Sequence, residues 1–122
     1  MLTEENRRYI LNEYLRIIHI ISDKDYQRRV WILGESSGSD FDEICCLFFG
    51  DIGDPILEHY KDFWITNRQY CILKKFRDRF SSFSDEHSYE PAFIDTPEWN
   101  EITEMAKEVL KSFNYEEKKN EH

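Results

Sequence analysis

The sequence has no long apolar run. Its longest uninterrupted apolar segment, residues 44–49, has six residues, whereas a membrane-spanning helix needs about 20. We therefore predict no membrane-spanning segment and no membrane partner. Residues 1–8 carry acidic side chains where a secretory signal has a basic start and an apolar core, so we expect a cytoplasmic protein.

Cysteine is scarce and occurs only at Cys45, Cys46 and Cys71. An odd number is a poor disulfide framework, and adjacent cysteines do not have the spacing of a zinc site. Free cysteine behaves as a small apolar residue, so we predict that Cys45 and Cys46 lie in the core. A redox or metal role for this pair is the alternative.

Motifs of catalytic and cofactor-binding sites are missing. The chain has no nucleophile elbow, no phosphate-binding P-loop and no glycine-rich dinucleotide fingerprint. A calcium loop starting at Asp40 would need glycine at its sixth position and glutamate at its twelfth, where the chain has Cys45 and Asp51. We therefore expect no enzymatic activity, no cofactor and no metal.

Basic residues are almost absent from two segments. Residues 34–62 have eight acidic residues and only Lys61 against them, and residues 85–108 have eight and only Lys107. The two segments sum to −14 while the whole chain is −9, so the remainder is at +5. Nucleic-acid binding depends on neutralising phosphates, which these segments would repel. The charge therefore predicts no nucleic-acid partner and favours a basic protein.

Apolar and aromatic residues are plentiful, at 40% and 16% of the 122 residues. This composition suffices for one packed core. We predict a single helical domain over residues 1–115. Residues 116–122 contain no apolar side chain and are predicted to form a disordered charged tail.

Helix N-terminal patterns recur along the chain. A capping residue followed by acidic residues, by proline or by a Glu or Gln three positions later is typical of a helix start. Such starts occur at Thr3, at Ser22 or Asp23, and at Asp40, Asp54, Thr66 and Thr96. They predict an all-α fold, a single compact bundle of five or six helices.

The expected ends and buried stripes follow from the apolar spacing. Residues 70–83 repeat apolar side chains every three or four positions, which predicts an amphipathic helix. Gly50 is expected to end the helix that follows Asp40. The apolar run Val30, Trp31, Ile32 and Leu33 is compatible with a short strand, although helix is favoured because no partner strand is evident.

The acidic residues of the first segment exceed what helix capping requires. Asp40 and Asp54 are predicted to be caps, whereas the others have no local role. We therefore predict a binding face for a cationic protein, with Phe41 or Trp31 as an apolar anchor. Its predicted residues are Glu35, Asp40, Phe41, Asp42, Glu43, Asp51 and Asp54.

Two other interpretations of these carboxylates stay open. They can form an inert solvated surface that keeps the protein soluble. They can also belong to a metal-dependent hydrolase that uses Asp51, Asp54 and His59.

On the helix starting near Thr66, the basic residues are predicted to pair with acids of neighbouring helices; the alternative is an RNA patch. These basic residues are Arg68, Lys74, Lys75, Arg77 and Arg79.

Residues 40–43 (Asp-Phe-Asp-Glu) and 93–99 (Phe-Ile-Asp-Thr-Pro-Glu-Trp), in a small acidic chain, resemble segments of bacterial immunity proteins. Those proteins neutralise nuclease toxins of the colicin and contact-dependent growth inhibition types. The resemblance is one of general character over the whole chain. It implies a basic toxin domain as partner and inhibition by binding. A helical adaptor or regulatory subunit is the alternative.

Overall fold

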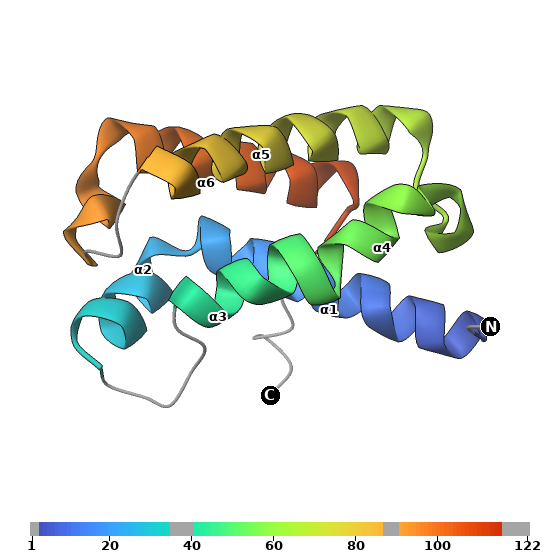
Figure 1. Ribbon diagram of the computed structural model, residues 1–122, viewed down its shortest axis with the longest axis horizontal. Helices are drawn as coiled ribbons and strands as arrows, with labels where there is room; N and C mark the ends of the chain where they lie inside the picture. The colour runs from blue at the N-terminus through green and yellow to red at the C-terminus, as the bar shows by residue number, and fades with distance from the viewer. Residues whose placement is uncertain (1–2, 35–40, 87–90, 116–122) are drawn as a thin grey trace.

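The computed structural model describes residues 3–34, 41–86 and 91–115, and these residues are all-α, as predicted (Figure 1). Three long helices form the frame, and shorter helical segments connect them. The elements in chain order are α1 (Glu4–Ser22), α2 (Lys24–Gln27), the π-helix η1 (Arg28–Ile32), α3 (Phe41–Cys46), the π-helix η2 (Leu47–Asp51), α4 (Gly53–Glu58), the 3₁₀-helix η3 (Tyr60–Phe63), α5 (Asn67–Glu86), the 3₁₀-helix η4 (Pro91–Asp95) and α6 (Pro97–Ser112).

The frame consists of α6 packed between α1 and α5. In Figure 1, α3 and α4 run below α5 and in front of α1, while α2 and η1 lie at the end of the molecule opposite the N-terminus. The described residues contain no strand, so the strand alternative for residues 30–33 is wrong and the favoured helical interpretation is confirmed. The predicted tail, residues 116–122, lies outside the described residues.

Capping hydrogen bonds confirm several predicted helix starts. The side chains of Thr3, Asp23 and Thr96 each accept a hydrogen bond from the backbone N–H three residues later, at 3.1, 3.1 and 3.2 Å. Each bond satisfies one of the N–H groups that a helix N-terminus leaves without an intrahelical partner. The caps therefore fix where α1, α2 and α6 begin.

The start of α5 is a reciprocal capping box. The backbone N–H of Gln69 donates to Thr66 Oγ1 at 3.1 Å, and the backbone N–H of Thr66 donates to Gln69 Oε1 at 2.8 Å. The Gln69 amide nitrogen also donates to the carbonyl oxygen of Ser112 at 2.9 Å. One side chain thus closes the start of α5 and satisfies a carbonyl at the end of α6.

Gly50 does not end its helix, contrary to the prediction. It lies inside η2, and the Ile52 N–H donates to the Leu47 carbonyl five residues back, at 3.1 Å. Only one residue, Ile52, separates this π-helix from α4. Apolar residues on both sides of Gly50 face the core, so tertiary packing carries the helix past the glycine.

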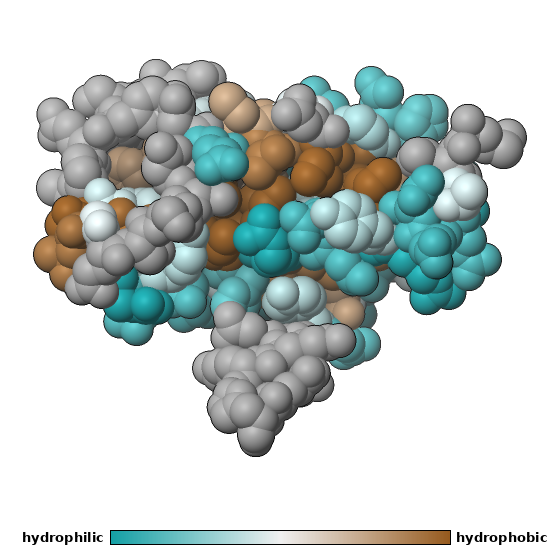
Figure 2. Space-filling model, turned by 90° about the horizontal axis from the view of Figure 1, so that it is seen from below, coloured by the Kyte–Doolittle hydropathy of each residue, from teal (hydrophilic) through white to brown (hydrophobic). Residues whose placement is uncertain are grey.

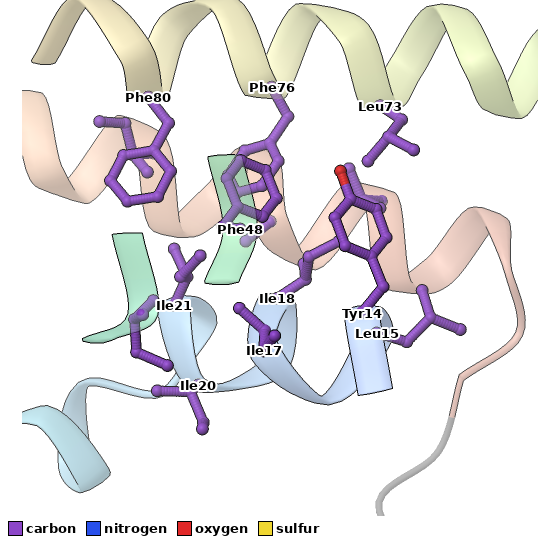
Figure 3. Close-up of a cluster of buried hydrophobic side chains, with 14 of the residues drawn as sticks. Tyr14, Leu15, Ile17, Ile18, Ile20, Ile21, Phe48, Leu73, Phe76 and Phe80 are labelled. Atoms are coloured by element: carbon purple, nitrogen blue, oxygen red, sulfur yellow. The ribbon is translucent and has the colours of Figure 1, made fainter. Parts of the chain in front are cut away.

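The core is built from the apolar stripes of α1, α5 and α6, closed on one side by α3 and η2. Figure 3 shows isoleucines of α1 facing aromatic rings of α5 and η2. The predicted α5 stripe is confirmed for Leu73, Phe76, Phe80 and Phe83, all buried. Cys45 is buried as predicted, but Cys46 is exposed, because successive helical residues point about 100° apart.

A buried amide crosses the interior. Gln27 is fully buried; its amide nitrogen donates to the carbonyl oxygens of Ile20 and Ile21 at 2.8 and 2.9 Å, and its amide oxygen accepts from the Trp99 indole N–H at 2.9 Å. These bonds satisfy the last turn of α1 and the only polar atom of the Trp99 side chain. They tie α1, α2 and α6 together.

Gly53 allows α4 to approach η2 closely. A Cβ at this position would lie 1.6 Å from the Phe48 carbonyl oxygen and 3.2 Å from a ring carbon of Tyr14. A Cβ at Gly50 would meet no atom within 4 Å. Gly53 therefore has a steric requirement that Gly50 lacks.

We predict that Gly53→Ala lowers the free energy of unfolding by at least about 2–3 kcal/mol, because backbone must shift to accept the methyl group. Gly50→Ala is the matched control and is expected to be neutral or stabilising by up to about 1 kcal/mol, since alanine is the better helix former. Urea denaturation measures both. Equal effects of the two substitutions would contradict the steric role of Gly53.

Tyr14 places a hydroxyl group in the apolar interior. Its ring stacks on Phe48, with centroids 5.3 Å apart, and within the described part of the chain its hydroxyl has no hydrogen-bond partner. Burial raises the pKa of Tyr14, and the nearby Arg77 cation only partly opposes this shift. The phenol therefore stays neutral in the folded state above the pH at which it ionises in the unfolded chain.

A raised folded-state pKa means that stability is lost as pH rises above about 10, the ordinary tyrosine value. We predict that Tyr14→Phe is neutral or stabilising by about 1 kcal/mol at pH 7, since it removes an unpaired buried hydroxyl. It should also reduce the loss of stability between pH 9.5 and 11. Urea denaturation at these pH values tests both. A destabilised variant at pH 7 would mean that the hydroxyl makes a favourable interaction.

Candidate protein-binding surface

The predicted binding residues from Phe41 to Asp54 belong to α3, η2 and α4, which follow one another along one side of the molecule (Figure 1). Of the acidic members, Glu43 on α3 and Asp54 on α4 have described, exposed side chains. Asp42 and Asp51 lie in α3 and η2, but their side chains are outside the described part. Glu35 and Asp40, with the predicted Asp40 cap, lie outside the described residues.

Phe41 lies in the interior. Its side chain is only 8% exposed, and its ring contacts Phe93 and Trp99 at centroid distances of 4.6 and 5.9 Å. Trp31, the other predicted anchor, is half-buried and meets the Phe41 ring edge-on at 5.4 Å. Phe41 therefore joins α3 to the core and is not an exposed anchor in this structure.

Asp54 is an ion-pair partner and not a helix cap. It lies in the first turn of α4, whose N-cap residue is Ile52 and has no side-chain capping bond. Its carboxylate accepts a hydrogen bond from Arg77 Nη2 of α5 at 3.3 Å. Arg77 also stands over the Phe49 ring, 5.6 Å from the centroid. The charge predicted to face a partner is thus compensated at this position.

A hollow separates α4 from α5 around this ion pair. It has a volume of about 360 Å³ and is lined by Asp54, Leu57, Glu58, Tyr70, Lys74 and Arg77. Lys74 pairs with Asp78 of its own helix at 3.2 Å. Both signs of charge are therefore present in the hollow, and it does not select for a basic ligand.

Basic residues of α5 pair with neighbouring helices, in part as predicted. Arg77 reaches Asp54 of α4, and Arg79 Nε donates to Glu101 of α6 at 2.7 Å. Lys74 instead pairs within α5. Exposed pairs of this kind stabilise a protein by about 0–1 kcal/mol each. Their main effect here is to neutralise part of the acidic charge carried by α4 and α6.

Two residues of the hydrolase alternative, Asp54 and His59, have different partners. Asp54 is turned to Arg77, whereas His59 Nε2 lies 3.8 Å from Glu58. Over the described residues, no three side chains of the His, Cys, Asp or Glu type lie together as metal ligands would. The side chain of Asp51 is outside this description.

Exposed apolar side chains are the feature that the sequence reasoning missed. Ile32 and Leu33 are 39% and 61% exposed, and hydrophobic atoms reach the surface at the η1 end of the molecule (Figure 2). Trp64 is 48% exposed and adopts a left-handed backbone conformation with φ of 60°. The guanidinium of Arg8 lies over its ring, 5.1 Å from the centroid. Periodicity alone identifies apolar residues but not which of them stay uncovered.

No family model, curated protein or solved structure matches this chain. Among the helices of the described residues, none is both long enough and apolar enough to cross a bilayer.

The pairing of Asp54 with Arg77 can be separated from a capping role by a double-mutant cycle of Asp54→Ala and Arg77→Gln. We expect a coupling energy of about 0.2–1 kcal/mol that decreases in 1 M salt, because the pair is exposed and salt screens it. Thr96→Ala, which removes a cap, is the control and should cost about 1 kcal/mol at either salt concentration. A loss of stability for Asp54→Ala that is independent of both Arg77 and salt would show that Asp54 acts as a cap.

Proposed function

We propose that the protein is a cytoplasmic bacterial immunity protein that binds a basic toxin domain and so neutralises it. The observation that carries this proposal is the acidic excess of residues 34–62, whose described part includes α3, η2 and α4 along one side of the molecule. Within it, the described side chains of Glu43, Glu58 and Asp62 are exposed. Asp54, by contrast, pairs with Arg77 of α5.

The proposed mechanism is electrostatic steering followed by occlusion. A nuclease contacts its substrate with Lys and Arg, and clustered carboxylates attract such a surface over several ångströms before contact. On contact, the carboxylates pair with the same basic residues and thereby exclude the substrate. Charge of this kind mainly raises the association rate and fixes orientation.

A helical adaptor is the second candidate function. It is favoured by a second exposed surface at the N-terminal end of the molecule, where Trp64 lies beside Arg7 and Arg8. Tryptophan, tyrosine and arginine are the residues that dominate many protein interfaces. An adaptor could engage one partner there and another through α3 and α4.

The test uses the toxin domain expected in the neighbouring gene, made catalytically inactive. We predict that the double reversal Asp42→Lys and Glu43→Lys slows association at low salt by about tenfold while the protein stays folded. The control is Glu104→Lys with Glu108→Lys on α6, which changes the net charge equally. It should slow association much less, since its charges lie on another face.

Stopped-flow association at several salt concentrations, with circular dichroism for folding, gives both rates. The active toxin should also be tolerated by cells only when the wild-type protein is coexpressed. An association rate that the Asp42 and Glu43 reversal leaves unchanged at low salt would refute the acidic face. Failure of the wild-type protein to bind or protect would refute the immunity function itself.

A further inference from the structure

We propose that Ile32 and Leu33 form the apolar anchor of the interface and enter an apolar pocket on the basic partner. This inference rests on the immunity function proposed above and replaces Phe41 as the anchor. Both side chains stand at the end of η1, and Leu33 is the more exposed at 61%. Gly34 follows with φ of +63°, a left-handed backbone conformation.

The base of this anchor is firmly held. Trp31, the residue before Ile32, packs against Phe41, Phe93 and Trp99 at centroid distances of 5.4, 6.2 and 6.2 Å. Gln27, in the helix α2 that leads into η1, is buried and hydrogen-bonded to Trp99 and to the end of α1. An anchor on a rigid base loses little conformational entropy on binding, which favours affinity.

The backbone at this point is unusual. The Leu33 N–H donates to the Arg28 carbonyl at 3.0 Å, a five-residue π-helical bond. π-helical turns are rare and recur at functional sites. Here the wider turn ends the helix with two aliphatic side chains at the surface.

The charges around the anchor fit a basic partner. The cations of η1 are already paired, Arg28 with Asp95 at 3.2 Å and Arg29 with Asp25 at 3.8 Å. On the neighbouring α3, which is joined to Trp31 through Phe41, the side chain of Glu43 is exposed. An apolar centre with an exposed carboxylate on an adjoining helix is compatible with an interface core and its polar rim.

Other exposed apolar side chains fit such a partner less well. Trp64 at the N-terminal end lies beside Arg8, which pairs with Glu4 at 2.9 Å, and beside Arg7, whose guanidinium would repel a basic surface. The large hollow between α1 and α6, about 740 Å³, is lined by Lys24, Lys107 and Lys111 together with acidic residues. Among the residues that the structure describes, the η1 end alone combines exposed aliphatic side chains, paired cations and an acidic residue on an adjoining helix.

The experiment measures binding of the inactive toxin domain to Leu33→Ser and to the pair Ile32→Ser with Leu33→Ser. We predict a dissociation constant at least tenfold weaker for each variant, arising from faster dissociation, with an unchanged slope against salt. Tyr9→Ser is the matched control, because Tyr9 is equally exposed, at 66%, but lies near the N-terminus at the other end of the molecule. It should change the dissociation constant less than twofold.

The outcomes separate this inference from the immunity function. Tight binding of the wild-type protein together with unchanged binding of both η1 variants overturns the anchor and leaves the immunity function intact. If the wild-type protein does not bind the toxin domain, both the anchor and the immunity function are refuted. Melting temperatures identify any variant that fails to fold. In that case Leu33→Met, which retains the apolar side chain, must restore the dissociation constant to within threefold of the wild-type value, and failure to do so also overturns the anchor.

Discussion

The buried side chain of Gln27 is the interaction on which the arrangement of the other elements depends. Its amide joins two carbonyl groups at the end of α1 to the indole of Trp99 in α6. Each of these groups is in the interior, where a polar group without a partner costs about 1–3 kcal/mol. Because the Gln27 side chain makes all of these hydrogen bonds, it fixes α2 against both α1 and α6. The position of η1, and therefore of Ile32 and Leu33, follows from it.

The sequence predicted the local part of this fold well. Thr3, Asp23, Thr66 and Thr96 were recognisable as helix starts because a capping side chain acts on a backbone group only three residues away. The stripe of α5 was recognisable for the same reason, since its period of 3.6 is a local property. It could not be predicted that Gln27 is buried, because its partners lie as far as Trp99, 72 residues along the chain.

Predictions failed where a distant residue decided the outcome. Asp54 has the sequence of a cap, yet Arg77, 23 residues later, offers its carboxylate a charged partner. Phe41 lies within an acidic stretch of sequence that is typical of a protein surface, but its ring packs against rings from η1, η4 and α6. The binding face predicted from charge therefore mixed residues with three different roles. Only the packing distinguishes the core ring, the compensated carboxylate and the exposed Glu43.

Charge and apolar burial would act at different stages of the proposed complex. The acidic excess acts at long range and governs how quickly a basic partner arrives, but an exposed ion pair adds only about 0–1 kcal/mol once formed. Burying a leucine side chain contributes about 1.5–3 kcal/mol, so a single apolar anchor outweighs several rim pairs in holding the complex together. An acidic surface alone would thus associate with many basic proteins but bind few of them tightly. Selectivity requires the apolar anchor to be held at a fixed distance from the carboxylates. In this chain Trp31 provides that spacing, because it connects η1 directly to the first residue of α3.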